Sequence, residues 1–288
     1  MYIGRFAPSP TGPLHTGSLL AAVISYLDAK AHQGNWLVRI EDLDPPREQP
    51  GAAEQILRTL EAHHLNWDGS VLYQSQRHDA YQAAVDRLLA QGDVYPCQCS
   101  RKQLSLYHQK HSMSLPHPEK CIQEFSSEAP FALRAKPANY CYRDLYQGIQ
   151  QGQDGHFVVK RRDQLFAYQL AVVVDDHDQN ITHVIRGHDL LDSTPKQLIL
   201  YKALGYTPPI FGHFPVIVAK NGQKLSKQNF APAIDHKNAF NNLKHVFHYL
   251  QLNTPDTNDC EELLDSGIEQ WKEKVPSIIS SQSIQENI

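Results

Sequence analysis

RFAPSPTGPLHTGS, residues 5 to 18, is the stretch that decides the fold of this 288-residue chain. It follows a short strand predicted at residues 2–6, and its three prolines and Gly12 interrupt regular structure before the helical periodicity of residues 17–32. A second strand, loop and helix follow at residues 36–40, 41–49 and 51–64. Repetition of this unit predicts an α/β fold with a doubly wound parallel sheet.

The rest of the chain continues the pattern around one irregular segment. An amphipathic helix is predicted at residues 76–91, after which prolines and cysteines interrupt the chain from 95 to about 131, as in an insertion. Further strands and helices are predicted at residues 167–174, 181–186, 193–204 and 214–218, with two more helices around 238–250 and 260–271. The Ser/Gln-rich tail from Pro276 is expected to be disordered.

Composition bounds the class of protein. With 41% hydrophobic residues the chain can bury a sizeable core, and its formal charge of -4 does not by itself indicate a nucleic-acid partner. No apolar run approaches the roughly 18 residues of a membrane span, and the first residues do not resemble a signal peptide. We therefore expect a soluble, cytoplasmic protein. Five cysteines, an odd number, argue against a disulfide framework and leave metal binding open.

Two motifs have the chemistry of phosphate binding. A loop that leaves a parallel strand and enters a helix presents backbone N–H groups and a helix dipole to phosphate; His15 can add a hydrogen bond, and Gly17 allows close nucleotide packing. The string KLSK, Lys224 to Lys227, places two ammonium groups where they could neutralise a leaving pyrophosphate. Taken alone, the first motif could be a capped Pro-rich turn and the second a solvated basic loop.

Together and in this order, the two motifs resemble the signatures of class I aminoacyl-tRNA synthetases of the glutamate and glutamine branch. His15 to Ser18 resembles the His-Ile-Gly-His element, with Ser18 in its fourth position and therefore expected to do less of the phosphate work. The lysine string resembles the Lys-Met-Ser-Lys-Ser element. The resemblance implies Lys227, His15 and Lys224 as catalytic residues, and an ATP site formed by His15, Gly17, Ser18 and Lys227.

The same resemblance implies a glutamate pocket, which should supply two strong donor groups and one acceptor. The stretches RIEDLD (39–44), AYQLAVVVDD (167–176) and HVIRGHDLL (183–191) resemble the family. Glu41 is expected to hold the α-ammonium, and the other pocket residues are Arg5, Phe6, Ala7, Pro8, Ser9, Tyr168 and Arg186. Other interpretations stay open: Arg39 and Glu41 as a surface pair, Tyr168 as a core aromatic, and Arg186 as a partner of Asp175 or Asp189.

A third constellation is a predicted zinc site at Cys97, Cys99, His117 and Cys121. Three sulfurs and one imidazole satisfy tetrahedral zinc, although these could also be buried, inert thiols. The small synthetase paralogues carry a Cys-x-Cys, Tyr, Cys site here, and His117 in place of the tyrosine should strengthen it, because neutral imidazole needs no deprotonation. We expect one structural zinc per chain. Asp42 and Asp44 could bind magnesium or simply cap a loop, and magnesium is expected to arrive with ATP.

The nearest resemblance is to the glutamyl-Q tRNA(Asp) synthetase family, because only about sixty residues follow Lys227 and no anticodon-binding domain can be formed from them. It implies a Rossmann-like catalytic domain that activates L-glutamate with ATP and transfers it to the queuosine base of tRNA(Asp), as a monomer without membrane contact. The alternatives are a truncated glutamyl-tRNA synthetase that charges a tRNA 3′ end, and a non-catalytic RNA-binding relative. The expected divisions are catalytic halves at 1–95 and 166–228, an acceptor-facing zinc insertion at 96–165, a helical stem-contact region at 229–275 and the tail at 276–288.

Overall fold

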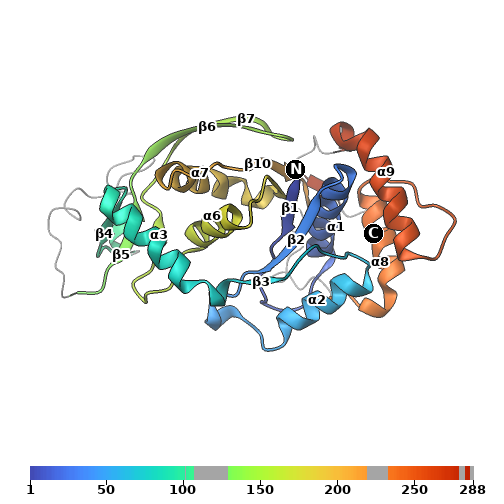
Figure 1. Ribbon diagram of the computed structural model, residues 1–288, viewed down its shortest axis with the longest axis horizontal. Helices are drawn as coiled ribbons and strands as arrows, with labels where there is room; N and C mark the ends of the chain where they lie inside the picture. Colours follow the sequence, from blue (N-terminus) through green and yellow to red (C-terminus); the bar gives the residue numbers. More distant parts are fainter. Residues whose placement is uncertain (101, 107–128, 219–232, 279–282, 286–288) are drawn as a thin grey trace.

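The computed structural model describes residues 1–100, 102–106, 129–218, 233–278 and 283–285 (Figure 1). At its centre are two adjoining parallel sheets, one of β1 (Ile3–Phe6), β2 (Asn35–Ile40) and β3 (Leu72–Tyr73), the other of β9 (His183–Gly187) and β10 (Ile210–Phe214). Strand β9 lies beside β1, where the Thr182 backbone N–H donates to the Ile3 carbonyl at 2.9 Å. In the spatial order β3-β2-β1-β9-β10, the chain moves outward to one side from β1 and to the other side from β9. The topological switch point therefore lies between β1 and β9, which is where doubly wound sheets bind ligands.

The sheet separates two hydrophobic cores, because successive side chains of a strand point to opposite faces. Tyr2 and Phe6 belong to one core, whereas Ile3 packs against the other. On β2, Trp36 and Leu37 divide in the same way. The alternation places Arg5 and Arg39 on the same face as Ile3 and Leu37, so two cations are directed into the second core.

Helices cover both faces of the sheet (Figure 1). The first core includes residues of α1 (Thr16–Ala31), α2 (Ala52–Ala62), α8 (Ala239–Tyr249) and α9 (Cys260–Ile278). The second includes residues of α3 (His78–Gln91), α6 (Tyr168–Asp178) and α7 (Thr194–Ala203). No helix in the described ranges is long and apolar enough to cross a membrane.

The segment between α3 and α6 contains antiparallel strands. A three-stranded sheet is formed by β4 (Val94–Cys97), β5 (Ala132–Ala135) and β8 (Val158–Lys160). A hairpin is formed by β6 (Ala138–Asp144) and β7 (Gly148–Asp154), and it extends over α7 and β10 (Figure 1).

Two local differences from the predicted elements have clear reasons. The strand expected at 214–218 is divided into β10 and β11 (Val216–Val218), because Pro215 lacks the N–H needed to continue a ladder. The tail expected to be disordered from Pro276 instead continues α9 to Ile278, and β12 (Ser283–Gln285) pairs in parallel with β11. A sheet edge supplies backbone partners that composition alone does not reveal.

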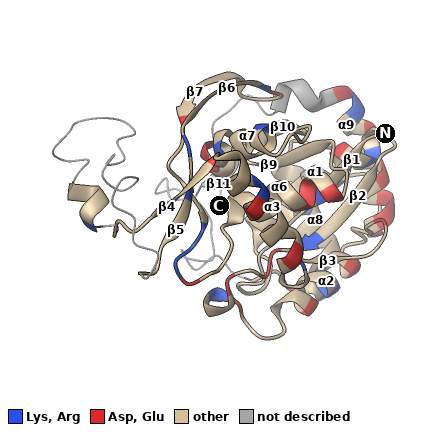
Figure 2. Cartoon of the chain, turned by 60° about the vertical axis from the view of Figure 1, so that its left-hand side comes forward, with Lys and Arg blue, Asp and Glu red and all other residues tan. Residues whose placement is uncertain are grey.

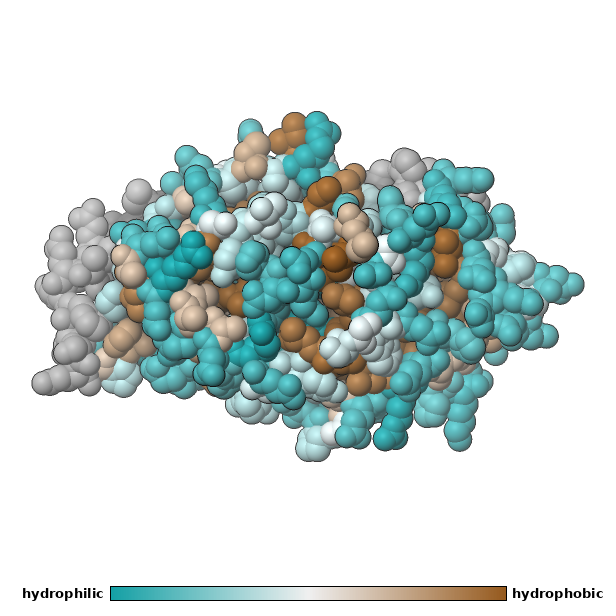
Figure 3. Space-filling model, in the orientation of Figure 1, coloured by the Kyte–Doolittle hydropathy of each residue, from teal (hydrophilic) through white to brown (hydrophobic). Residues whose placement is uncertain are grey.

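The surface is of mixed character. The face in Figure 3 is largely hydrophilic, with hydrophobic residues visible in separate small areas. Charged residues of both signs are distributed over the elements (Figure 2). The segment from Thr254 to Ile288 is acidic, with eight carboxylates against two lysines.

Candidate active site

A cavity of about 370 Å³ lies at the carboxyl ends of β1 and β9. The loop after β1, the first turn of α1, the start of α6 and the end of β9 form its walls. The residues predicted from the sequence that line it are Arg5, Phe6, Ala7, Pro8, Ser9, His15, Gly17, Ser18, Tyr168 and Arg186. The topological switch point thus brings together side chains that are up to 181 positions apart in the chain.

Glu41 does not line this cavity but an adjoining one of about 290 Å³. Ser9 and Tyr168 line both cavities, so they form the boundary between them. The Glu41 carboxylate is 3.7 Å from Arg39 Nη2, and its Oε1 is buried without a hydrogen-bond partner among the described residues. Burial raises the pKa of Glu41 to about 7, although Arg39 and Arg5 act to lower it.

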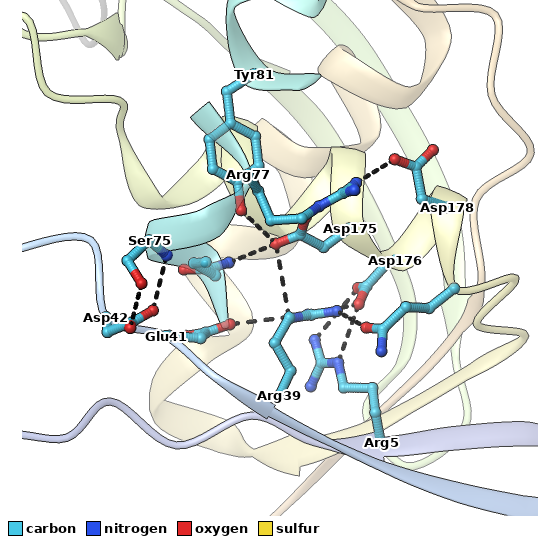
Figure 4. A network of polar contacts seen from close by, with 12 residues as sticks. Arg5, Arg39, Glu41, Asp42, Ser75, Arg77, Tyr81, Asp175, Asp176 and Asp178 are labelled. Carbon is cyan, nitrogen blue, oxygen red and sulfur yellow. Dashed lines mark hydrogen bonds and ion pairs between the residues drawn. The ribbon is translucent and has the colours of Figure 1, made fainter. Parts of the chain in front are cut away.

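Arg5 and Arg39 are held by one buried carboxylate, Asp176 of α6 (Figure 4). Arg39 Nη2 is 2.6 Å from Asp176 Oδ1, and Arg5 donates through Nε at 3.2 Å and Nη2 at 3.3 Å. Burial alone would raise the pKa of Asp176, but these two guanidinium groups hold it below its usual range. The alternative that Arg39 and Glu41 form a surface pair is therefore wrong, because Arg39 is fully buried.

The neighbouring Asp175 extends the network to α3 and the turn before it (Figure 4). It accepts hydrogen bonds from Gln74 at 2.8 Å, Tyr81 at 2.8 Å and Arg77 at 3.1 Å. The two consecutive carboxylates thus share Arg39, whose Nε is 3.9 Å from Asp175 Oδ2, but Asp176 also binds Arg5 whereas Asp175 also binds the α3 side. The C-terminal half of α6 is thereby fixed to β1, β2 and α3.

Arg186 has a separate set of partners. Its Nε donates to His213 Nε2 at 2.9 Å, and its Nη2 donates to Thr194 Oγ1 and Gln197 Oε1, both at 2.8 Å. The remaining Nη1 is buried with no hydrogen-bond partner in the described part of the chain. Neither Asp175 nor Asp189 is among these hydrogen-bond acceptors, so the alternative that Arg186 is an ion-pair partner of one of them does not describe the observed network.

His15 caps helix α1. Its Nδ1 accepts from the backbone N–H groups of Gly17 at 3.1 Å and Ser18 at 3.3 Å, and Ser18 Oγ accepts from the His15 N–H at 2.8 Å. These amides were expected to be available to phosphate. A helix's first N–H groups lack partners within the helix, and here the His15 ring satisfies two of them. A neutral His15 therefore carries its ring proton on Nε2, as a donor.

Lys224 and Lys227 lie outside the described residues, but both flanks of their segment are described. Val216 of β11 lines the main cavity. After the segment, Ala233 forms a bridge with His15, and Ile234 donates to the Leu14 carbonyl at 2.8 Å. The chain thus leaves from the cavity and returns to the start of α1.

The predicted zinc ligands are only partly described. Cys97 is the buried last residue of β4 and Cys99 follows it half-buried, whereas His117 and Cys121 lie outside the described residues. Across the described ranges no group of three or more His, Cys, Asp or Glu side chains could hold a metal ion. Two neighbouring thiols fit half of a tetrahedral zinc set.

The acids after β2 act as loop caps. Asp42 accepts from the Ser75 backbone N–H at 2.9 Å and from its hydroxyl at 2.6 Å. Asp44 pairs with Arg47 at 2.6 Å and with Arg161 at 3.6 Å. Of the two interpretations left open by the sequence, the observed contacts favour the capped loop.

Comparison with known proteins decides the family. Residues 3–264 match the family described as tRNA synthetases class I (E and Q), catalytic domain. A protein of Vibrio cholerae named Glutamyl-Q tRNA(Asp) synthetase is 48% identical over 281 residues, covering 94% of this chain and 90% of that protein. One of Neisseria meningitidis with the same name is 45% identical, covering 96% and 98%. The chain belongs to the glutamyl-Q tRNA(Asp) synthetase family. The resemblance seen in the motifs is confirmed.

The solved structures add the fold. Glutamate-tRNA synthetase from Elizabethkingia anophelis is similar with a TM-score of 0.79 and 25% identity, over 99% of this chain and 68% of that one. The glutamate tRNA ligase from Elizabethkingia meningosepticum, solved with its amino acid, has a TM-score of 0.76 and 26% identity over 66% of its length. The parallel α/β fold predicted from the sequence is that of the class I synthetase catalytic domain.

Several residues of the site were not predicted. Asp176 stood inside a quoted stretch without an assigned role, and Asp175 was named only as an alternative partner of Arg186. Two adjacent acids directly after the apolar run LAVVV are a signal for a buried polar contact, because buried carboxylates need partners. His213, Thr194 and Gln197 had no comparable signal.

Proposed function

We propose that this protein activates L-glutamate with ATP and transfers the glutamyl group to the queuosine base in the anticodon of tRNA(Asp). The observation that carries the activation half is a pair of buried atoms without hydrogen-bond partners among the described residues. Glu41 Oε1 is an acceptor and Arg186 Nη1 a donor, and the two residues line the two cavities that share Ser9 and Tyr168. An amino acid at this boundary would satisfy both, its ammonium at Glu41 and a carboxylate at Arg186.

The two arginines have different roles in this proposal. Arg5 uses Nε and Nη2 on Asp176, so it contributes mainly positive charge and shape at the cavity wall. Arg186 retains one uncommitted donor and supplies the directed hydrogen bond to a carboxylate. A second carboxylate of the substrate would lie near Tyr168 and Arg5, which distinguishes glutamate from neutral amino acids.

ATP would occupy the part of the cavity lined by His15, Gly17 and Ser18, with its magnesium held mainly by phosphates and water. The glutamate carboxylate attacks the α-phosphorus, the P–O bond to pyrophosphate breaks, and glutamyl-adenylate forms. The His15 ring and the dipole of α1 stabilise the phosphate charge. The anchored flanks at Val216 and Ala233 support placing Lys224 and Lys227 beside the leaving pyrophosphate.

The transfer half requires no covalent enzyme intermediate. A hydroxyl of the queuosine ring attacks the carbonyl of the mixed anhydride, and AMP leaves. Positioning and electrostatic stabilisation account for both steps. The name of the similar Vibrio and Neisseria proteins supports this acceptor, as does the extent of similarity, since the match covers 90% and 98% of those proteins but only 68% and 66% of the Elizabethkingia synthetases.

Pyrophosphate exchange tests the activation half. Glutamate-dependent exchange of labelled pyrophosphate into ATP, without RNA, is expected, with no exchange on glutamine or aspartate. Glu41→Gln should abolish it, and Asn253→Ala, in the C-terminal region, should not. Absence of exchange in correctly folded protein would favour a non-catalytic RNA-binding relative.

A transfer assay tests the acceptor. Labelled glutamate is expected to be incorporated into queuosine-modified tRNA(Asp), and not into unmodified tRNA(Asp) or tRNA(Glu). Periodate treatment before the reaction should block incorporation, because it cleaves cis-diols. Charging confined to tRNA(Glu) would instead establish a truncated synthetase acting on a 3′ end.

We also propose that Cys97, Cys99, His117 and Cys121 hold one structural zinc within the insertion at 96–165, and that the two catalytic halves span residues 1–95 and 166–228. Cys97 and Cys99 lie at the end of β4, where a metal would join the antiparallel sheet to the following segment. Purified protein should contain about one zinc per chain. Cys97→Ser should lower zinc content and thermal stability, whereas Cys141→Ser, on the exposed hairpin, should change neither.

A further inference from the structure

Behind Arg186 lies a buried chain of two side chains. Asp144 is the last residue of β6, and His213 lies on the neighbouring β10. Asp144 is 1% and His213 0% exposed, so neither reaches solvent or the cavity directly. Nothing in the proposed reaction uses them. Burying an ionisable pair costs free energy unless further hydrogen bonds satisfy it, so the contacts of this pair need an explanation.

The contacts of His213 with Asp144 and Arg186 define its tautomer, and Thr194 Oγ1 also lies 3.1 Å from His213 Nε2. Asp144 Oδ2 is 2.5 Å from His213 Nδ1, and Arg186 Nε lies 2.9 Å from His213 Nε2. A guanidinium can only donate, so His213 Nε2 must accept. The ring proton is therefore on Nδ1, where the Asp144 carboxylate accepts it. Burial lowers the pKa of His213, and Arg186 adds to this, which keeps the ring neutral.

The other oxygen of Asp144 binds the backbone. Its Oδ1 accepts from the N–H groups of Tyr146 and Gln147 at 3.0 Å and of His213 at 3.1 Å. The hairpin turn is also fixed to β10, because Leu145 donates to the Phe211 carbonyl at 2.9 Å. The Asp144 carboxylate thus accepts four hydrogen bonds, three at Oδ1 from backbone N–H groups and one at Oδ2 from His213.

We propose that Asp144 and His213 are positioning residues for glutamate binding: the carboxylate selects the His213 tautomer, and the ring orients the Arg186 guanidinium so that Nη1 faces the cavity. This inference rests on the proposed function. Thr194 and Gln197 bind Nη2, and His213 binds Nε, so together they set the plane of the group. The β6–β7 hairpin thereby contributes a residue to the amino-acid site through a single intervening ring.

Asp144→Asn isolates the tautomer. Asparagine keeps an oxygen for the three backbone N–H groups but presents an NH2 group to His213 Nδ1. The ring must then carry its proton on Nε2, which opposes the Arg186 Nε–H. In pyrophosphate exchange we expect KM for glutamate to rise about 10- to 100-fold, with KM for ATP and kcat nearly unchanged, because uniform binding is lost.

Substitutions at His213 separate positioning from folding. His213→Gln retains an acceptor oxygen for Arg186 and should restore most of the glutamate affinity, whereas His213→Leu removes it. The double variant Asp144→Asn/His213→Gln should have nearly the same KM for glutamate as His213→Gln alone, because glutamine has no ring tautomer for residue 144 to select. Ile149→Ser, exposed on the same hairpin, is the matched control, and thermal unfolding of each variant reports stability separately.

Different results overturn different statements. Equal changes in KM for glutamate and ATP, or none with Asp144→Asn, would overturn the positioning role while leaving the proposed function intact. If Asp144→Asn and His213→Gln raise KM for glutamate additively, Asp144 acts only through its backbone hydrogen bonds. That result would also overturn the positioning role. Wild-type protein that neither exchanges pyrophosphate nor binds glutamate in calorimetry would remove the proposed function and this inference with it.

Discussion

The buried position of Glu41 is explained by the proposed binding of glutamate and not by a contribution to folding stability. Its carboxylate is buried, and its Oε1 has no hydrogen-bond partner among the described residues. A pKa of about 7 means that the group is partly protonated at neutral pH in the free protein. Binding an ammonium ion would favour the carboxylate form, so ligand affinity and pH are linked.

We predict that glutamate affinity falls as pH falls below about 7, because protonated Glu41 is a poor acceptor for the α-ammonium. Calorimetric titrations between pH 5.5 and 8.5 should show affinity approaching a tenfold loss per unit at the acid end. Glutarate, which lacks the ammonium, is the control and should show no such change near pH 7. A flat profile for glutamate would exclude Glu41 as the ammonium partner.

Asp176 shows the opposite behaviour, since it stabilises the fold by pairing with two buried cations. Asp176→Asn should cost about 3–5 kcal/mol, because it leaves Arg5 without its counter-charge and removes the nearest carboxylate from Arg39, which keeps only the more distant Glu41 and Asp175. Asp178→Asn, two residues on and 42% exposed in its pair with Arg77, should cost about 0–1 kcal/mol. Urea unfolding of both variants measures this difference, and equal costs would contradict it.

The pH dependence of the Asp176 contribution has a definite sign. Its folded-state pKa is lowered, so its stabilisation is present above the unfolded carboxyl pKa and is lost as pH falls through the folded value. Acid unfolding of the wild type should therefore include a contribution that Asp176→Asn lacks.

Strand β10 and the β6–β7 hairpin pack closely together at Gly212, where there is no room for a side chain. A Cβ at Gly212 would lie 2.7 Å from Tyr146 and 2.9 Å from Ile185, so both neighbours would have to move. Tyr146 is in the turn that Asp144 holds, and Ile185 is next to Arg186. The hairpin, the central sheet and the amino-acid site therefore meet at this glycine.

We predict that Gly212→Ala destabilises the protein by about 1–3 kcal/mol through overpacking and raises KM for glutamate more than KM for ATP. Gly69→Ala is not a fair control, because Gly69 has a positive φ of 72°. Ala203→Gly, near the end of α7, is better and should cost about 0.5–1 kcal/mol with unchanged KM values. A destabilised Gly212→Ala protein with normal glutamate affinity would show that the hairpin and the site are not coupled.

At the scale of the whole molecule, the C-terminal helices share the core of the catalytic sheet. Trp271 of α9 donates from Nε1 to Asp28 Oδ1 of α1 at 3.0 Å, and Tyr2 donates to the other oxygen of Asp28. Trp271 is 1% exposed, and its neighbours in the core come from α1, α8 and β2. Helices α8 and α9 are therefore part of the catalytic body and not a separate unit.

We predict that Trp271→Phe costs about 2–4 kcal/mol, because it leaves a buried carboxylate oxygen without its donor and creates a small cavity. Glu269→Gln, exposed on the same helix, should change stability by less than about 0.5 kcal/mol. Thermal unfolding should remain a single transition in both variants. Separate melting of the C-terminal helices in Trp271→Phe would contradict a shared core.

The family, the parallel α/β fold and ten of the residues that line the main cavity could be predicted from the sequence alone. The local signals were strong there, since turn-forming prolines, a helix start and strand periodicity act over a few residues. His15, Tyr168 and Arg186 could be named because each lies in a motif, and their meeting follows from the carboxyl ends of parallel strands sharing one edge.

The hydrogen-bond and ion-pair partners of those residues were known only once the tertiary structure was available. Asp176 holds Arg5 and Arg39 across 171 and 137 positions, and Asp144 reaches Arg186 through a ring on β10. Such contacts depend on which faces of distant elements are buried together, and no local propensity contains that information. For the same reason the sequence left Arg186 with an aspartate as an alternative partner, whereas the buried core placed a histidine, a threonine and a glutamine around it.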